Sequence, residues 1–492
     1  MSFEDSEGLF FLRYNNEQIF FIFLGGFIFI MSENSQVKRE TFASRLGFIF
    51  LSAGCAIGLG NVWRFPFITG QYGGAAFVLI YVLFLLFLAM PIMAMEFAVG
   101  RASQKSVSRA FAVLKPEHKV WSIWGYAGWI GNIILMMFYT VVTGWMLAYT
   151  YYSAAGSLSN LNSEAVGGIF NSLLANPKEL IFWMGLAVVI GFLVCYSGLQ
   201  NGVERITKMM MCGLLAIMIA LAIRSVTLEG ADKGLEFYLK PDFNKLVSNG
   251  IWTTLYAALG QAFFTLSIGI GSMAIFGSYI SKDRSLMGES LIVTGLDTFV
   301  AFTAGLIIFP ACFAYGINPG AGPGLIFVTL PNMFNFMPGG RIWGALFFLF
   351  MSFAALSTVI AVFENIVACF MDRLGWTRKT SSIVMAILIF VLAIPCALGF
   401  NVWSDVQPLG AGSGILDLED FIVSNNMLPF GSIIYLLFCV SRYGWGWDNF
   451  VKEVDEGKGL KFPKALRAYF TYFVPVVMLI ILIVGYVQTF VK

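Results

Sequence analysis

Charge is scarce in this chain, because Asp, Glu, Lys and Arg together make up only 12% of its 492 residues. Soluble domains carry roughly 25% charged residues. The formal net charge of +2 is too small to indicate a nucleic acid partner. The sequence has one histidine, His118, in a basic loop, and no nucleophile–base pair or metal-ligand cluster stands out. We therefore expect a membrane protein that is not an enzyme.

Cysteines in loops, where disulfides commonly form, are also missing. All seven cysteines lie within or at the edge of apolar runs, and none has a plausible partner in a loop: Cys55, Cys195, Cys212, Cys312, Cys369, Cys396 and Cys439. We expect free thiols that pack as small hydrophobic side chains.

The pattern of a signal peptide is missing from residues 1–30. The apolar stretch 19–30 is only about a dozen residues long, short of the roughly 20 that a membrane helix needs. It has no basic region before it and no clear small-residue cleavage site. We expect residues 1–36 to be an extension without a fixed fold. Met31, which precedes a polar and basic stretch, is an alternative start, and the intact mass of the native protein would test it.

Hydrophobic residues, in contrast, make up 58% of the chain, and the mean hydropathy is +0.80. A run of roughly 20 mainly apolar residues is long enough to cross a bilayer as a helix. About eleven such runs are present, several long enough to be tilted: 46–70, 75–99, 122–153, 180–198, 204–224, 250–280, 286–315, 341–372, 381–400, 418–440 and 467–490. The predicted fold class is an all-α integral membrane protein.

Basic residues in the short loops predict the orientation, because cytoplasmic loops are enriched in Lys and Arg. Such residues precede the first span and follow spans two, four, six, eight and ten, whereas loops 154–179, 316–340 and 401–417 are nearly free of them. The longer loop 225–249 is an exception, in which three lysines are balanced by acids. We expect a cytoplasmic amino terminus and an external carboxyl terminus.

Two glycine-broken stretches interrupt the first and sixth spans, at 54–61 and 265–271. Glycine costs roughly 1 kcal/mol against alanine inside a helix, and a backbone freed from its helix inside a membrane must find other partners. Broken helices in corresponding positions of two halves are typical of transporters with a binding site at the bilayer midplane. Spans one to five and six to ten form two such sets, and because five is odd the second runs inverted.

We expect the chain to consist of six parts. After the extension we expect a first repeat at 37–225, an external loop at 226–249 and a second repeat at 250–440. A cytoplasmic loop at 441–466 and an eleventh span at 467–492 complete the chain. The Gly- and Pro-rich segment 317–340 is a candidate external lid.

Helix packing is the alternative interpretation of the first break, because Gly54 and Gly58 alone form an ordinary close-packing motif of membrane helices. A dinucleotide-binding motif is excluded, since no strand precedes the glycines and no acid follows at the required distance. Asn61 beside one break and Thr265 and Ser267 beside the other favour a binding site. Their oxygens, with freed carbonyls, are hard ligands that suit an alkali cation, and half-helix amino termini suit a carboxylate.

Several motifs resemble the neurotransmitter:sodium symporter family. They are Arg45-Leu46-Gly47, Gly58-Leu59-Gly60-Asn61-Val62-Trp63-Arg64-Phe65-Pro66, Gly73-Gly74-Ala75-Ala76-Phe77, Glu96-Phe97-Ala98-Val99-Gly100-Arg101 and Gln261-Ala262-Phe263-Phe264-Thr265-Leu266-Ser267. The resemblance covers residues 37–490, and eleven spans suggest the bacterial amino-acid branch. It implies a LeuT-type fold of two inverted five-helix repeats plus one extra helix. It also implies sodium-driven import of amino acids or amines across the cytoplasmic membrane of a bacterium.

The resemblance implies two sodium ions. The first site would use Ala56, Asn61, Thr265 and Asp297 together with the substrate carboxylate. The second would use the carbonyls of Gly54, Ile57 and Ala354 and the hydroxyls of Ser357 and Thr358. For these two hydroxyls the alternative is back-bonding to carbonyls of their own helix.

Asp297 lies deep in the seventh span, where a carboxylate is costly unless it is paired. It aligns with a family position usually held by Asn, and Ala301 replaces a chloride-coordinating Ser one turn later. We hypothesise that the Asp297 carboxylate supplies the negative charge that chloride supplies in other members. A protonated structural Asp is the alternative, and proton antiport stays open.

The resemblance also implies an amino-acid pocket. Tyr139 would bind the substrate carboxylate, unless it is a core tyrosine, and Gly58 stands where amine carriers have Asp. Because no pocket residue is charged, a charged substrate side chain would stay unpaired, so we predict a hydrophobic or aromatic amino acid. The expected lining is Cys55, Ala56, Gly58, Gly60, Leu135, Tyr139, Phe264, Thr265, Ser267, Ile270, Thr358 and Val362.

Two gates follow from the same resemblance. Arg64 with Asp420 would form the external gate, above the aromatic lid Phe264. Arg39 with Asp372 would form the internal gate. The alternative for Arg39 is a positive charge that only determines the orientation of the protein in the membrane. Exposed pairs of this kind are individually weak, which suits a reversible contact.

One departure from the family concerns the fifth span, where Cys212 replaces a proline ten residues after Gly202. Unwinding of that helix is therefore in doubt, although Gly213 is a partial substitute. A membrane receptor that binds an amino acid without transporting it is the second functional hypothesis. A chloride-dependent amine carrier is disfavoured by Gly58 and Ala301. The oligomeric state is not determined by the sequence.

Overall fold

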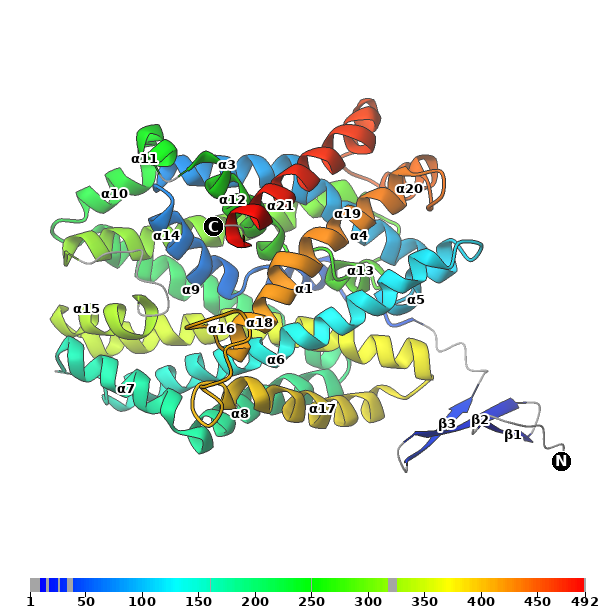
Figure 1. Cartoon of the computed structure of the whole chain (residues 1–492), viewed down its shortest axis with the longest axis horizontal. Helices are drawn as coiled ribbons and strands as arrows, with labels where there is room; N and C mark the ends of the chain where they lie inside the picture. The colour runs from blue at the N-terminus through cyan, green and yellow to red at the C-terminus, as the bar shows by residue number, and fades with distance from the viewer. Residues whose placement is uncertain are drawn as a thin grey trace.

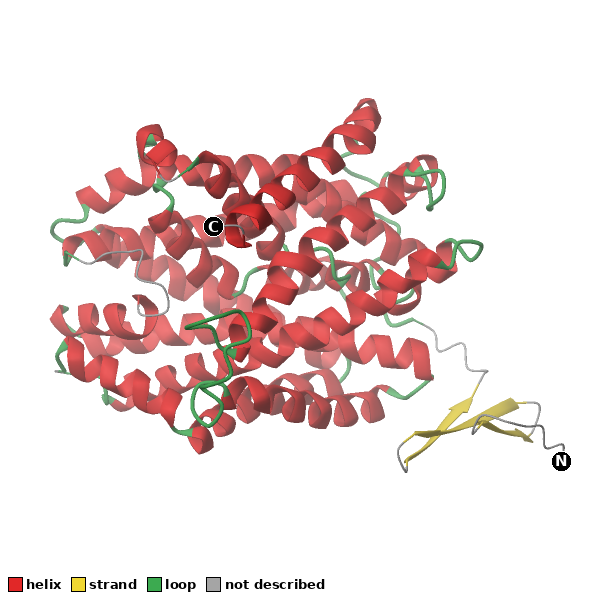
Figure 2. Ribbon diagram, viewed as in Figure 1, coloured by secondary structure: helices red, strands yellow, loops and turns green. Residues whose placement is uncertain are grey.

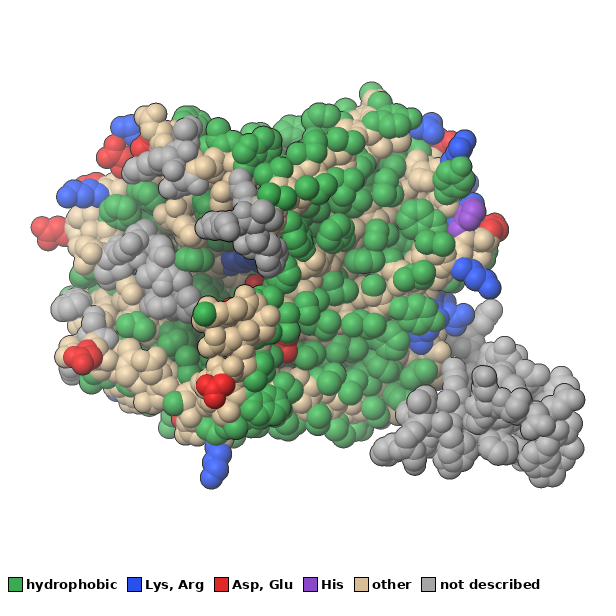
Figure 3. Space-filling model, in the orientation of Figure 1, with side chains coloured by type: hydrophobic (Ala, Val, Ile, Leu, Met, Phe, Trp, Pro, Cys, Tyr) green, Lys and Arg blue, Asp and Glu red, His purple; other side chains and the backbone are tan. Residues whose placement is uncertain are grey.

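The computed structural model describes residues 9–14, 17–24, 27–32, 39–159, 161–248, 250–316 and 325–490. Long helices dominate it and run roughly along one direction (Figures 1 and 2). Hydrophobic side chains cover the middle of the visible face, and charged side chains gather toward its two ends (Figure 3). This is the surface that a protein surrounded by lipid presents.

Nine helices or helix runs in the described residues are long and apolar enough to cross a membrane. They are α3–η2–α4 (Ala75–Ser103), α6 (Val120–Ala155), α8 (Pro177–Tyr196), η3–α9 (Leu199–Val226), α14 (Leu286–Ala314), α16 (Gly340–Leu374), α17 (Arg378–Leu398), α18–η5–α19 (Ile415–Val440) and η6–η7–α21, whose apolar span is Lys464–Val487. A bent pair, α1 (Arg45–Ala56) with η1–α2 (Gly60–Gln71), is a tenth candidate.

The remaining expected span is the sixth, which the structure divides into α12 (Ile251–Thr265) and α13 (Ser272–Gly277). Residues 266–271 between them are non-helical. The eleven apolar runs of the sequence therefore correspond to nine continuous spans and two broken ones within the described residues.

Short elements lie at the two ends of the bundle. At the end predicted to be external are α7 (Ser163–Ala175), α10 (Asp232–Leu239), α11 (Phe243–Ser248) and η4–α15 (Leu325–Phe336), which appear on the left of Figure 1. At the opposite end are α5 (Val107–Leu114) and α20 (Trp447–Val454). Residues 317–324 of the candidate lid lie outside the described residues.

Three strands occupy the segment in which we expected no fixed fold. They are β1 (Leu9–Tyr14), β2 (Glu17–Leu24) and β3 (Phe27–Ser32), paired antiparallel in that order. The segment is rich in Phe and Ile, which have high strand propensity. The remaining domain boundaries stay predictions.

Both broken spans have backbone conformations that a helix cannot contain. Ile57, which ends α1, is extended, with φ −73° and ψ 93°. In the sixth span Ser267, Gly269 and Gly271 have φ of 51°, 104° and 80°. Glycine adopts these left-handed angles freely, whereas Ser267 does so at a cost that is typical of functional sites.

The half-helix α13 packs tightly on α4 through two glycines. A Cβ on Gly100 would lie 1.8 Å from the carbonyl oxygen of Ala274, and a Cβ on Gly277 would lie 2.3 Å from that of Phe97. The two backbones are therefore in direct contact, and α13 and α4 form one packing unit.

We expect the variant G100A to be clearly less stable than the wild type. The added methyl group must displace the backbone of α13, and overpacking costs about 1–3 kcal/mol. Thermal unfolding of the purified protein in detergent measures the effect. The control is G295A in α14, where a Cβ would meet nothing within 4 Å. Equal stability of G100A and G295A would contradict direct backbone contact between α4 and α13.

Candidate functional site

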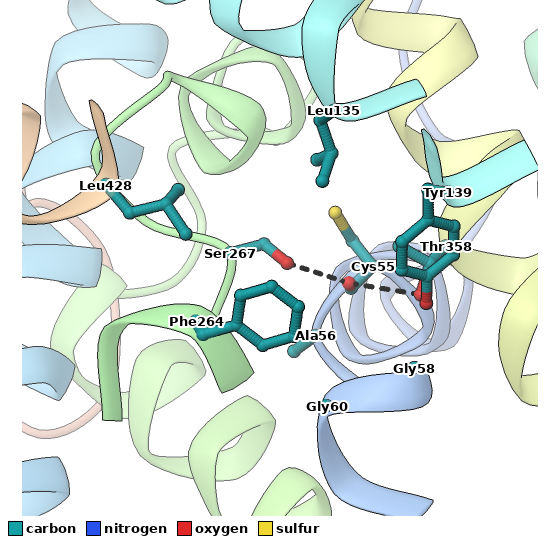
Figure 4. Close-up of a pocket in the computed structure, with 10 residues that line it drawn as sticks. All are labelled: Cys55, Ala56, Gly58, Gly60, Leu135, Tyr139, Phe264, Ser267, Thr358 and Leu428. Atoms are coloured by element: carbon teal, nitrogen blue, oxygen red, sulfur yellow. Dashed lines mark hydrogen bonds between the residues drawn. The ribbon is translucent and has the colours of Figure 1, made fainter. Parts of the chain in front are cut away.

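A pocket with an empty volume of about 330 Å³ lies between the two broken spans (Figure 4). Its lining contains nine of the residues expected from the sequence and one, Leu428 from α19, that was not expected: Cys55, Ala56, Gly58, Gly60, Leu135, Tyr139, Phe264, Ser267, Thr358 and Leu428. Thr265, Ile270 and Val362 are close in sequence to lining residues but do not line this pocket themselves. Leu428 follows a π-helical turn of the tenth span, η5 (Phe421–Met427), and no motif singled it out.

Polar groups gather at one end of the pocket. The Tyr139 hydroxyl accepts a hydrogen bond from the backbone N–H of Leu59 at 2.9 Å. A Cβ on Gly58 would lie 2.4 Å from that hydroxyl and 2.5 Å from the Thr358 hydroxyl. A hydroxyl that accepts one hydrogen bond still has its own proton to donate. This end therefore suits a small acceptor such as a carboxylate, and only glycine at 58 leaves room for it.

The rest of the pocket is apolar and carries no charge. Leu135, Phe264 and Leu428 surround it, and the Ser267 hydroxyl donates to the carbonyl of Cys55, another lining residue, at 3.0 Å (Figure 4). An apolar group enters such a space favourably, whereas a charged one would lose its hydration without a partner.

A cluster of oxygen atoms lies beside the pocket, where α1 meets α16. The Thr358 hydroxyl oxygen is 3.2 Å from the Gly54 carbonyl, 3.4 Å from those of Cys55 and Ala354, and 3.5 Å from that of Ile57. The Ser357 hydroxyl is 2.9 Å from the Ala354 carbonyl and 3.4 Å from that of Ile57.

The two hydroxyls make both kinds of contact considered for them: back-bonds to carbonyls of α16 and contacts with carbonyls of α1. Ser357 makes a short back-bond within α16, but the nearest carbonyl to the Thr358 hydroxyl belongs to Gly54 on α1. A hydroxyl has one proton and cannot satisfy four carbonyls. Surplus acceptors that face one another are the surroundings a hard cation prefers. The cluster brings together the residues that were expected at the second sodium site, and their assignment to an ion stays a prediction.

A second polar cluster surrounds Asp297 on α14. Asn61 donates to its carboxylate at 2.8 Å and to its backbone carbonyl at 3.1 Å. The Thr265 hydroxyl lies 3.1–3.2 Å from both carboxylate oxygens. All three side chains are fully buried, and the described ion pairs include none at Asp297. A buried carboxylate with neutral partners requires a cation or a proton. The chemistry of these three residues, which were expected together from the sequence, therefore fits a cation site.

The end predicted to be cytoplasmic is closed. Arg39 lies 3.2 Å from both carboxylate oxygens of Asp372 and also donates to the Ser278 hydroxyl at 2.9 and 3.0 Å. The backbone N–H of Ser106 donates to Asp372 at 2.6 Å. Cys369, three residues before Asp372 on α16, is fully buried. Arg39 thus has a specific partner besides any effect on topology.

The opposite end is open. Arg64 and Asp420 both line a second cavity, with an empty volume of about 910 Å³, but no ion pair joins them among the described residues. The Arg64 guanidinium lies instead over the Phe264 ring, 4.4 Å from its centroid, and Asp420 accepts from the Ser424 hydroxyl at 2.5 Å. Phe264 therefore separates the pocket from the outer cavity, whereas the expected pair of Arg64 with Asp420 is not formed in this conformation.

The fifth span is wound throughout. Its π-helical start η3 (Leu199–Glu204) continues into α9 (Arg205–Val226), and Cys212 stands within that helix, where its side chain is exposed. The other six cysteines are buried, and all seven are free. The packing predicted for the thiols is confirmed for six of them, and Cys212 is the exception.

We expect the variant R39Q to increase the rate at which a water-soluble maleimide modifies Cys369. Loss of the charge on residue 39 removes the ion pair with Asp372, which lies three residues from this thiol on α16, and so favours opening of that end. Peptide mapping by mass spectrometry on a C212S background measures the rate. The variant R64Q is the control, because Arg64 lies at the opposite end, and its Cys369 should react as slowly as in the background. An unchanged rate in R39Q would show that this contact does not hold the end closed.

The model of the sodium:neurotransmitter symporter family matches residues 39–167 and 169–491. The chain is 38% identical over 407 residues to an uncharacterised sodium-dependent transporter of Bacillus subtilis, YhdH, covering 82% of this chain and 88% of that protein. It is 32% identical over 466 residues to one of Haemophilus influenzae, covering 92% and 99%. A crystal structure of MhsT in complex with L-phenylalanine matches with a TM-score of 0.83 and 39% identity, over 91% of this chain and 100% of that one.

Proposed function

Because this chain belongs to the sodium:neurotransmitter symporter family, we propose that it imports a hydrophobic or aromatic L-amino acid together with sodium ions. The family and the LeuT-type fold are those expected from the sequence. The protein is a multi-pass membrane transporter rather than an enzyme. One observation supports the substrate class above the others: the pocket has a small polar end at Tyr139 and Gly58, and its remainder is uncharged.

The two ends of the pocket suit the two ends of an α-amino acid. The carboxylate meets the Tyr139 hydroxyl and the space left by Gly58, and the apolar side chain lies among Leu135, Phe264 and Leu428. The complex of MhsT with L-phenylalanine supports this class, because that protein shares the fold and 39% of its residues with this chain. An amine without a carboxylate would leave the polar end unoccupied.

Sodium has two proposed positions. One is the cluster of Asn61, Thr265 and Asp297, with the carbonyl of Ala56 and the substrate carboxylate. The other is the oxygen cluster at Thr358. A substrate that itself provides a ligand to the first ion makes the binding of sodium and substrate mutually favourable, because coupling between two sites is reciprocal.

The transport cycle follows from the asymmetry of the gates. The end at Arg64 is open while the end at Arg39 is closed, so sodium and substrate enter from the Arg64 side. Positive charge in the loops assigns that side to the exterior of a bacterial cytoplasmic membrane, with the amino terminus inside. Substrate then brings Arg64 and Asp420 together over Phe264, and the opposite end opens.

We expect proteoliposomes containing the protein to accumulate radiolabelled L-phenylalanine when an inward sodium gradient is applied. Collapse of that gradient should abolish the accumulation. Excess unlabelled Leu, Met, Tyr or Trp should reduce it, whereas Lys and Glu should not, because their charges would be unpaired in the pocket. Binding without accumulation would favour the receptor hypothesis, and competition by Lys or Glu would overturn the pocket assignment.

A matched pair of variants tests the role of sodium in the same assay. T358V replaces a hydroxyl with a methyl group of similar size and should raise the sodium concentration for half-maximal uptake by about tenfold, since charge-assisted contacts are worth roughly 1.5–3 kcal/mol. T358S retains the hydroxyl and should stay near the wild type.

Uptake should be independent of chloride, because Asp297 already provides a buried negative charge. Replacement of chloride by gluconate should leave the wild-type rate unchanged. The variant D297N should lose most of its uptake, and the double variant D297N/A301S should regain part of it only when chloride is present. A301S alone is the control and should remain chloride-independent. A strict chloride requirement of the wild type would refute the role assigned to Asp297.

A further inference from the structure

The non-helical segment 266–271 of the sixth span is held by side chains from other helices. The indole N–H of Trp124 donates to the Gly269 carbonyl at 3.0 Å, and the amide nitrogen of Asn132 donates to the Ile270 carbonyl at 2.9 Å. Both donors belong to α6. Glu96 of α4 accepts from the backbone N–H of Gly269. The carbonyls of this part of the break therefore depend on α6.

Of these two donors on α6, Asn132 makes the larger number of contacts. It is fully buried, and its amide nitrogen also donates to the Gly128 carbonyl of α6 at 2.7 Å. Its side-chain oxygen accepts from the Ser272 hydroxyl at 3.0 Å. Ser272 is the first residue of α13. One side chain thus binds both the last part of the break and the start of the half-helix that follows it.

The surface of α6 around Asn132 allows this close approach. A Cβ on Gly128 would lie 3.0 Å from the Ile270 carbonyl oxygen, and a Cβ on Gly131 would lie 3.1 Å from Cγ2 of the Ile270 side chain. With glycine at both positions, the backbone of the sixth span lies directly on α6. At Gly128 the backbone of α6 therefore lies against the backbone of residue 270. The hydrogen bond from the Asn132 amide to the Ile270 carbonyl holds the two together.

The two sides of this contact belong to different packing units. The half-helix α13 packs on α4 through Gly100 and Gly277, whereas α6 packs on α8, α16 and α17. Beyond α13, Ser278 and Tyr279 contact Arg39 at the closed end of the protein. If α13 moves with α4 when that end opens, the bonds of Asn132 to Ile270 and Ser272 must break.

We propose that Asn132, assisted by Trp124, is a latch that keeps α13 on α6 while the Arg39 end is closed. It is a positioning residue, because it acts on the backbone beside the pocket and does not line the pocket. Only the function of the latch in transport rests on the proposed transport cycle. The contact itself and its effect on the closed end are testable in the absence of substrate.

The variant N132L retains the side-chain shape and removes the amide. In sodium-free buffer we expect Cys369 of N132L to react with maleimide about fivefold faster than in the C212S background, the effect of losing one net hydrogen bond of about 1 kcal/mol. Saturating sodium without substrate should slow the reaction again, because sodium is proposed to bind the state in which the Arg39 end is closed and therefore restores its population. Damage to the fold would instead speed the labelling of the buried Cys312 on α14 as well.

Matched variants separate the latch from general packing. T140V, which removes a buried hydroxyl that bonds only within α6, should react as the background does. W124F should react faster than the background but less than N132L, and it keeps the test valid if N132L does not fold. A background rate in both N132L and W124F would overturn the latch. Faster labelling of Cys369 alone that sodium does not slow would leave the latch supported and contradict the proposed sodium sites instead, whereas equally faster labelling of Cys312 would overturn the latch.

Discussion

A peptide group that leaves its helix inside a membrane must be satisfied by something other than water. Two spans of this protein are interrupted near their centres, and the two interruptions face one another across one pocket. The structure satisfies the freed groups in two ways. Some are bound by buried side chains, such as Tyr139, Gln261 and Asn132. Others, around Thr358, remain as a surplus of acceptors. That division separates the parts that hold the backbone from the parts that can hold an ion.

The same constraint explains why the site is precise although it is built on non-helical backbone. Each break is fixed by partners from several helices: Tyr139 on α6 and Asn61 near the first break, Glu96 on α4 and Trp124 on α6 at the second. Asp297 then joins the two broken spans, because Asn61 and Thr265 both bind its carboxylate. Within the part of the chain that the structure describes, a carboxylate that takes part in none of the ion pairs thus lies where the two halves meet.

The difference between the paired gate residues at one end and the unpaired gate residues at the other indicates which parts move. Arg39 and Asp372 close one end with additional bonds from the backbone, whereas Arg64 and Asp420 at the other end share a cavity without pairing. The partner of Arg64 in this conformation is the Phe264 ring, so one cation and one aromatic side chain cover the pocket before the outer pair forms. The bonds of α6 to the second break lie beside α13, and the residues that follow α13 contact Arg39 at the closed end.

The sequence by itself determined the membrane-spanning helices, both broken spans and most of the site. Long apolar runs and glycine beside Asn61 or Ser267 are local patterns, and six of the ten pocket residues lie in segments that such patterns or family motifs single out. Leu135, Tyr139 and Thr358 were expected only from the family resemblance. Leu428, the stacking of Arg64 on Phe264 and the role of Asn132 required the tertiary structure. They depend on which faces of helices distant in the chain meet, and on the conformation that the gates adopt. A helix carries its own hydrogen bonds, so its sequence reveals it, whereas the partners of a broken helix come from elsewhere in the chain and are decided by packing.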